Sequence, residues 1–132
     1  MDRTIRNTVC PALAPALAKV LANVPSSLLT RTSELRIRAG QPLQLTADTG
    51  DYFVGPDGEP LKSTSGAYIC TCGDLIQTLQ LISRNSLYAY EEELRMGYIT
   101  IAGGHRIGLA GQAIVQGGNL VAMKNISAMN IR

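Results

Sequence analysis

The sequence predicts an α+β domain: an N-terminal helix, a mixed or antiparallel sheet with two further helices, and a C-terminal three-stranded antiparallel meander. Apolar residues recur at helical spacing near the N-terminus and again around residue 76. From Tyr98 onward, apolar and polar residues alternate with a period of two, which is typical of strands. Because 132 residues can bury a core of their own, we expect residues 1–132 to form one domain.

The first predicted element is a helix from Pro15 to about Asn23. Proline suits the first turn of a helix, and Pro25 ends it, so that residues 26–33 read as a polar connector. The apolar stripe of this helix and its flanks is Leu13, Leu17, Val20, Leu21 and Val24. Prolines interrupt the run and Lys19 closes it, which argues against a signal peptide, and no segment reaches the ~20 apolar residues that span a bilayer.

Short strands are predicted next. Apolar residues alternate with polar ones on either side of a break at residues 40–42, and these apolar positions are Leu35, Ile37, Leu43 and Leu45. Turn signals at residues 50–51 and 56–58 flank a third apolar piece, residues 52–54, which is expected to pack against the strand before it.

Two helices are predicted in the middle of the chain. Thr71 and Asp74 indicate the start of a helix that runs to about Ser83, because a hydroxyl and a carboxylate at these positions satisfy free backbone amides. Its apolar stripe is Leu75, Ile76, Leu79 and Ile82. A short helix over residues 86–97 is expected to carry the solvated side chains Glu91, Glu92 and Glu93.

The last part of the chain predicts the meander, with turns at residues 103–104 and 117–119. Gly108 and Gly111 are expected to mark a bulge or a close backbone approach. The stretch GGHRIGLAG does not match G-x-G-x-x-G and starts between two strands, so no dinucleotide site is expected there.

Charge and cysteine content limit the function classes. A net charge of +2 is too small to indicate nucleic-acid binding. Three cysteines are an odd number, which favours a reducing compartment, with the cytoplasm as the default. Cys70 and Cys72 are too close together for a typical structural zinc site, even with Cys10 and His105, so we predict no metal. The cysteines are interpreted as small, partly buried residues whose reactivity stays open.

No catalytic residue is predicted, since no G-x-S-x-G nucleophile elbow occurs and His105 is interpreted as a strand-end histidine bonded to the backbone. Alternation places Arg106 on the face opposite Ile107 and Leu109. There its guanidinium could either clamp phosphate oxygens or form a surface salt bridge with residues 91–93.

The segment Ser86 to Arg132, SLYAYEEELRMGYITIAGGHRIGLAGQAIVQGGNLVAMKNISAMNIR, together with ELRIRAGQPLQL upstream, resembles the N-terminal domain of the stage III sporulation protein AA family. This family is related to secretion and pilus-retraction ATPases, and the resemblance covers roughly residues 26–132. In the family, a nucleotide-binding domain with a P-loop, G-x-x-x-x-G-K-[ST], follows. That motif does not occur in this sequence. We therefore expect either an excised domain or a protein without its ATPase domain, and no ATP hydrolysis by this chain alone.

The resemblance implies a hexameric ATPase that powers a secretion-like complex in endospore formation, at the cytoplasmic face of a membrane in the mother cell. It implies that ATP and magnesium are bound mainly by the other domain and that the partner is an integral membrane subunit. Arg106, with Arg36 and Arg38, becomes a candidate for nucleotide contact. The alternative is a stand-alone protein- or peptide-binding module that uses an exposed strand edge, and a small enzyme comes third.

Overall fold

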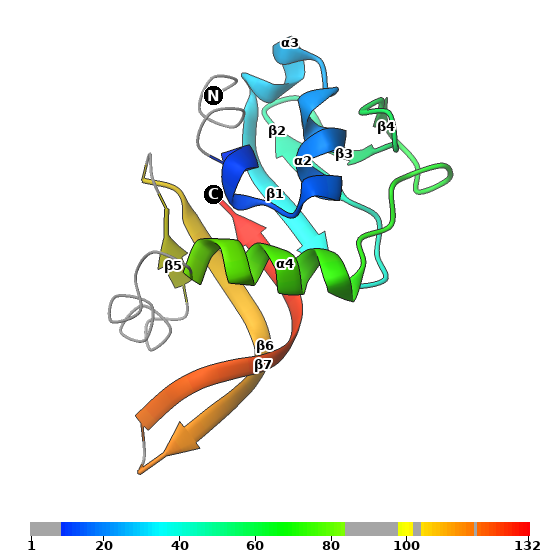
Figure 1. Cartoon of the computed structure of the whole chain (residues 1–132). Helices are drawn as coiled ribbons and strands as arrows, with labels where there is room; N and C mark the ends of the chain where they lie inside the picture. The colour runs from blue at the N-terminus through cyan, green and yellow to red at the C-terminus, as the bar shows by residue number, and fades with distance from the viewer. Residues whose placement is uncertain (1–8, 84–97, 102–103, 118) are drawn as a thin grey trace.

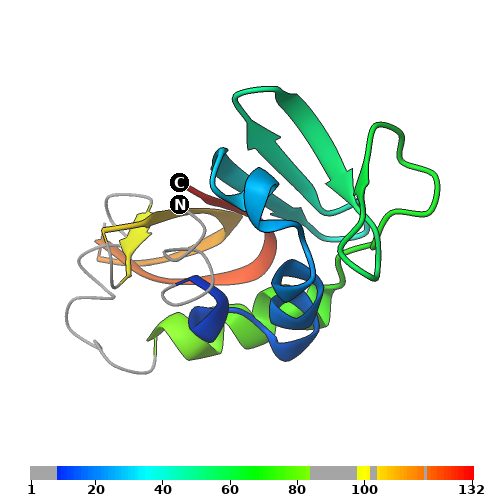
Figure 2. The same cartoon turned by 90° about the horizontal axis from the view of Figure 1, so that it is seen from above.

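The computed structural model describes residues 9–83, 98–101, 104–117 and 119–132, and shows one antiparallel sheet with helices on one of its faces (Figures 1 and 2). The seven strands follow the order β4-β3-β2-β1-β7-β6-β5. The described elements are η2 (Cys10–Ala12), α2 (Pro15–Ala22), α3 (Ser26–Leu29), β1 (Thr32–Arg38), β2 (Gln44–Ala47), β3 (Gly50–Val54), β4 (Pro60–Leu61), α4 (Cys72–Ser83), β5 (Tyr98–Thr100), β6 (Arg106–Gln116) and β7 (Asn119–Ile131). The predicted α+β class is confirmed.

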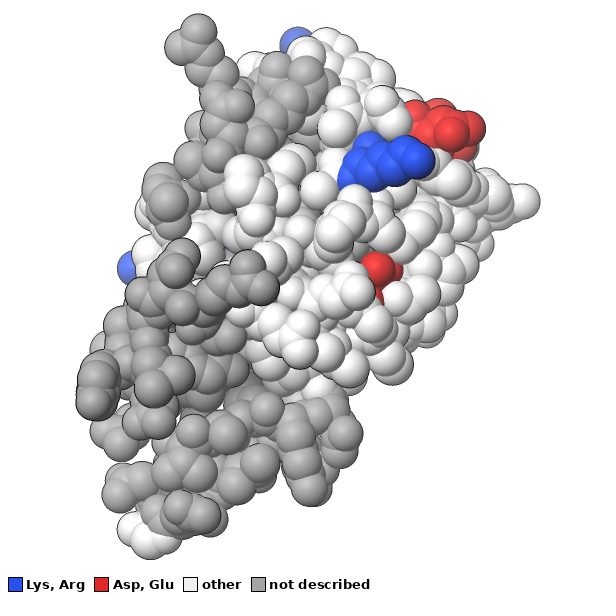
Figure 3. All heavy atoms as spheres, viewed as in Figure 1, with Lys and Arg blue, Asp and Glu red and all other residues white. Residues whose placement is uncertain are grey.

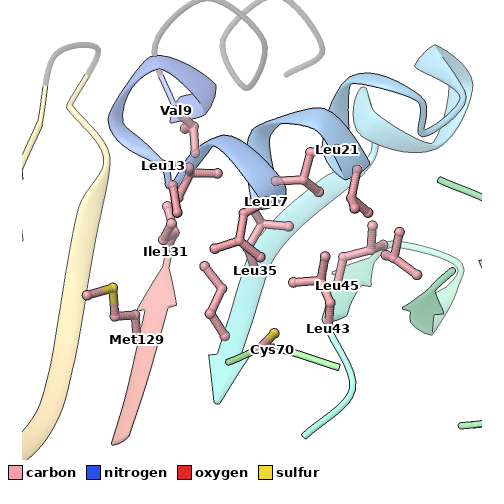
Figure 4. Close-up of a cluster of buried hydrophobic side chains, with 14 of the residues drawn as sticks. Val9, Leu13, Leu17, Leu21, Leu35, Leu43, Leu45, Cys70, Met129 and Ile131 are labelled. Atoms are coloured by element: carbon pink, nitrogen blue, oxygen red, sulfur yellow. The ribbon is translucent and has the colours of Figure 1, made fainter. Parts of the chain in front are cut away.

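The core lies between the helices and the sheet (Figure 4). Each member of the predicted N-terminal stripe is at most 5 % exposed, which confirms that the stripe faces the core: Leu13, Leu17, Val20, Leu21 and Val24. From the sheet, Leu35, Leu45 and Met129 meet this stripe. Burial of several large aliphatic side chains at ~1.5–3 kcal/mol each is what holds the two layers together.

Residues 26–33 are not the polar connector that was predicted. They form the short helix α3 and the start of β1, because the adjacent apolar side chains Leu28 and Leu29 are both buried. A four-residue helix is too short to leave a periodic signal in the sequence. The helix predicted for residues 86–97 lies outside the described residues.

Helix α4 begins as predicted. The amide of Asp74 donates to Oγ1 of Thr71 over 3.0 Å, and the amide of Thr71 donates to Oδ2 of Asp74 over 3.1 Å, which is a reciprocal capping box. The hydroxyl of Tyr68 donates to the same Oδ2 over 2.7 Å. Burial, reinforced by this bond to a carboxylate, raises the pKa of Tyr68 well above its ordinary value.

The predicted stripe of α4 is wrong at one position. Ile76 is 53 % exposed, whereas Leu75 and Ile82 are buried and Leu79 is partly buried. The buried face instead includes Thr78, whose Oγ1 accepts a hydrogen bond from the backbone N–H of Ala14 over 2.9 Å. This bond ties the start of α2 to the middle of α4.

The meander is confirmed, but it is part of the larger sheet. Strand β7 pairs with β6 on one side and, through residues 128–131, with β1 on the other. The register shifts between Ala110 and Gln112, which confirms the bulge expected at Gly111. Gly108 marks no close approach, because a Cβ added there would meet only the carbonyl oxygen of Asn130, at 3.9 Å.

Candidate functional site

The candidate site lies on the sheet face opposite the helices, which we call the outer face. On β1 the buried residues Leu35 and Ile37 point toward the helices, so the alternating residues Glu34, Arg36 and Arg38 lie on the outer face. The helix side of the molecule, in contrast, shows a mostly uncharged described surface (Figure 3). The basic side chains on these strands are therefore concentrated away from the helices.

Strand register brings residues from neighbouring strands together on this face. Arg36 lies opposite Asn130 of β7, Asn130 lies opposite Gly108 of β6, and Gly108 lies opposite Tyr98 of β5. Residues directly opposite each other in a sheet project to the same face. One row of side-chain positions thus crosses four strands, and Arg38 lies one row further along, opposite Ala128.

Arg106 is paired with a second arginine. The amide of Arg106 donates to the carbonyl oxygen of Arg132 over 3.1 Å, and the amide of Arg132 donates back over 2.9 Å. Their neighbours Ile107 and Ile131 are buried toward the helices and lie opposite each other in the register. Arg106 and Arg132 therefore share the outer face as a directly opposed pair, and both residues are exposed.

Contacts with described residues satisfy only part of this basic group. Glu34 lies between two arginines: its Oε2 is 3.4 Å from Nη2 of Arg36 and its Oε1 is 3.5 Å from Nε of Arg132. Nη2 of Arg38 donates to Oε1 of Gln44 over 3.0 Å. The buried Nε atoms of Arg36 and Arg38 have no hydrogen-bond partner among the described residues. Four arginine side chains against one glutamate side chain leave a net side-chain charge of +3 where β1, β7 and β6 lie side by side.

A hollow of about 290 Å³ opens between the arginine pair on the outer face. Its lining residues are Tyr98, Arg106, Gly108, Asn130 and Arg132. A second hollow of about 210 Å³ shares Gly108 and Asn130 and extends over Ala110 and Ala128. The guanidinium of Arg106 lies over the Tyr98 ring, with its Cζ 4.8 Å from the ring centre, within the range of a cation–π contact.

The predicted position of Arg106 away from the core is confirmed, and Arg36 and Arg38 lie on the same face, separated from β6 by β7. The alternative partners of Arg106, residues 91–93, lie outside the described residues. Sequence reasoning missed Arg132, Asn130 and Tyr98. Alternation alone could have placed Arg132 and Asn130 on one face, but their meeting with Arg106 depends on the register between β6 and β7.

Other residues considered in the sequence do not join this site. His105 is 7 % exposed, and its Nε2 has no partner among the described residues, so the expected backbone bond of its side chain is not observed there. Cys70 is buried, and burial raises the pKa of its thiol to about 11, whereas Cys72 is exposed rather than partly buried as expected. Within the described ranges, no three His, Cys, Asp or Glu residues are grouped in a way that could hold a metal ion.

Comparison with known proteins identifies relatives of the chain. Residues 3–132 match the family described as "Sporulation stage III, protein AA". "Stage III sporulation protein AA" of Bacillus subtilis (strain 168) is 32 % identical over 126 residues, which cover 96 % of this chain and 37 % of that protein. The chain thus spans little more than a third of the length of this relative. No solved structure matches this chain.

Within the described part of the chain, no helix is long and apolar enough to cross a membrane. The family match extends over nearly the whole chain and includes both strands that carry the arginine pair. The chain therefore belongs to the stage III sporulation protein AA family.

Proposed function

We propose that this chain acts in sporulation as the N-terminal domain of a hexameric stage III sporulation protein AA ATPase, where it makes subunit contacts and couples the nucleotide state to movement. The observation that carries this function is the net positive outer face, on which Arg106 and Arg132 line an open hollow and Arg36 and Arg38 lie on the nearby strand β1. A guanidinium is a rigid fork of donors that suits phosphate oxygens. A face of this kind can contact a nucleotide that another domain holds.

The remaining parts of the function lie beyond this chain. ATP and magnesium are bound mainly by a second, P-loop domain, which accords with a chain that spans 37 % of its relative and lacks a P-loop. The assembly works at the cytoplasmic face of a membrane in the mother cell. There it binds an integral membrane subunit and powers a secretion-like complex.

The test is the change Arg106→Ala in the full-length protein. We expect ATP turnover to fall at least tenfold, because a guanidinium acting on transferring phosphate can contribute ~10³ or more in rate. Arg106→Lys is expected to restore little, since an ammonium keeps the charge but not the bidentate geometry. The exposed Arg31, which lies outside the hollow, supplies a matched control in Arg31→Ala. A hexamer with Arg106→Ala and an unchanged turnover rate would contradict the proposal.

A second candidate function has one observation in its favour. Among the described strands, β5 pairs only with residues 106–108 of β6, and β1 pairs only with residues 128–131 of β7. The rest of the β6–β7 hairpin projects from the sheet with edges that no described strand covers (Figure 1). Such edges can bind an extended peptide, as a stand-alone binding module would. Peptide binding that is retained in Arg106→Ala but lost when a proline is placed in the β6–β7 hairpin would favour this function.

A further inference from the structure

Two like charges face each other across β6 and β7. Arg106 and Arg132 exchange both of their backbone hydrogen bonds, so their Cα atoms are close neighbours and their side chains leave the same face. Like charges directly opposite each other in a sheet are destabilising. Among the described residues, Glu34 is the one acid in an ion pair with either of them, through a long contact to Arg132. The pair is therefore short of negative charge.

The space between the two guanidiniums is open because Gly108 has no side chain. A Cβ at residue 108 would have only one neighbouring atom within 4 Å, so the hollow above it is not filled from the strands. Asn130 contributes an amide, which can donate to an anion, on the same row. Two guanidiniums and one side-chain amide thus line a volume of about 290 Å³, together with Tyr98 and Gly108.

We infer that this hollow binds the polyphosphate chain of a nucleotide through Arg106 and Arg132. In the absence of the nucleotide, Glu34 is the anionic partner of Arg132, and the polyphosphate replaces it on binding. The inference rests on the proposed function and extends it to Arg132, Asn130, Gly108 and Glu34. Glu34 suits this role because its side chain is only 12 % exposed, whereas that of Arg132 is 73 % exposed and already lines the hollow.

The phosphates, rather than the base, are the recognised part. The guanidinium of Arg106 already covers a face of the Tyr98 ring, so a base could stack on that face only by displacing it. Tyr98 therefore acts as a positioning residue that holds Arg106 over the hollow. ATP and tripolyphosphate should then bind this chain about equally, and AMP, with one phosphate, should bind much more weakly.

The test measures binding of tripolyphosphate, ATP and AMP to the 132-residue chain by calorimetry at low salt. For the measurement, two glycines are added after Arg132, so that the terminal carboxylate does not lie directly beside Arg106. We expect a Kd of about 10 μM to 1 mM for tripolyphosphate, which weakens as salt is added. Arg132→Ala should weaken binding about tenfold or more, because it removes charge-assisted hydrogen bonds. Arg31→Ala should leave the Kd within about twofold, because that exposed arginine does not line the hollow.

Two variants separate this site from general attraction to a basic surface. Gly108→Val keeps every charge and suits a strand, but it fills the hollow and should weaken binding at least about tenfold. Glu34→Gln removes the competing charge and should tighten binding about two- to fivefold, the range that an exposed ion pair is worth. No binding of tripolyphosphate at 10 mM, or equal affinities for Gly108→Val and the unchanged chain, would overturn the inference. The full-length turnover test of Arg106 could still succeed in that case, so the two failures are distinguishable.

Discussion

The hydrogen bond between Ala14 and Thr78 gives a sharp test of how the helices are held together. Both residues are fully buried, and the N–H of Ala14 has the Thr78 hydroxyl as its acceptor at 2.9 Å. Thr78→Val replaces the hydroxyl by a methyl group of similar size, which leaves the backbone N–H buried without its partner. We expect the free energy of unfolding to fall by about 1–3 kcal/mol, the desolvation cost of one unsatisfied buried group.

Urea denaturation followed by circular dichroism measures this loss, and Thr78→Ser is the matched control. Serine keeps the hydroxyl and loses one methyl group, so it should cost about 1 kcal/mol through packing alone. Hydrogen exchange gives an independent readout, because the amide of Ala14 should lose protection in the valine variant and keep it in the serine variant. A valine variant as stable as the unchanged protein, with the Ala14 amide still protected, would refute the importance of this bond.

Two further predictions concern glycine and cysteine. Gly58 (φ +83°) and Gly40 (φ +74°) both have left-handed backbones, but only at Gly58 would a Cβ collide with a neighbour, the backbone of Asn23. In urea denaturation, Gly40→Ala should cost about 1–2 kcal/mol and Gly58→Ala at least ~1 kcal/mol more, and equal losses would be the contrary result. The pKa of Cys70, raised to about 11 by burial, should make its alkylation at pH 8 at least ~100-fold slower in the folded than in the urea-unfolded chain. The raised pKa also means that its contribution to stability is complete below pH ~9 and is lost as the pH rises through 11, which pH-dependent unfolding would measure.

The elements that sequence could predict are those whose signal is local. The stripe of α2 repeats every three to four residues, and the capping pair Thr71 and Asp74 lies within one turn, so both could be placed without knowing the fold. Ile76 shows the limit of this reasoning. Its spacing fits the stripe of α4, but the buried face includes Thr78 instead, because the hydroxyl of Thr78 accepts a hydrogen bond from the backbone N–H of Ala14. The burial of a polar residue such as Thr78 depends on its hydrogen-bond partner, and this partner, Ala14, lies 64 positions away in the sequence.

The candidate site could be predicted only in part for the same reason. Alternation alone places Arg106 and Arg36 on the face away from the core. The opposition of Arg106 and Arg132 and the ion pair between Glu34 and Arg132 require β7 to lie between β1 and β6, and that pairing joins residues far apart in the chain. A one-residue change of register would send Arg132 to the helix side. The site is thus a product of strand pairing, which local patterns do not encode.

The position of the arginine pair also bears on how a bound anion could affect the rest of the molecule. Arg106 and Arg132 lie at one end of β6 and β7, and the same two strands continue to the turn at Gly117, beyond their contacts with β5 and β1. The hairpin is paired along its length except at two register shifts, one of them after Ala110. An anion that draws the two guanidiniums together would act on the base of this hairpin. A partner bound at its projecting end would therefore be linked to the arginine pair by two continuous strands, whose ladder is locally disrupted at the bulge after Ala110.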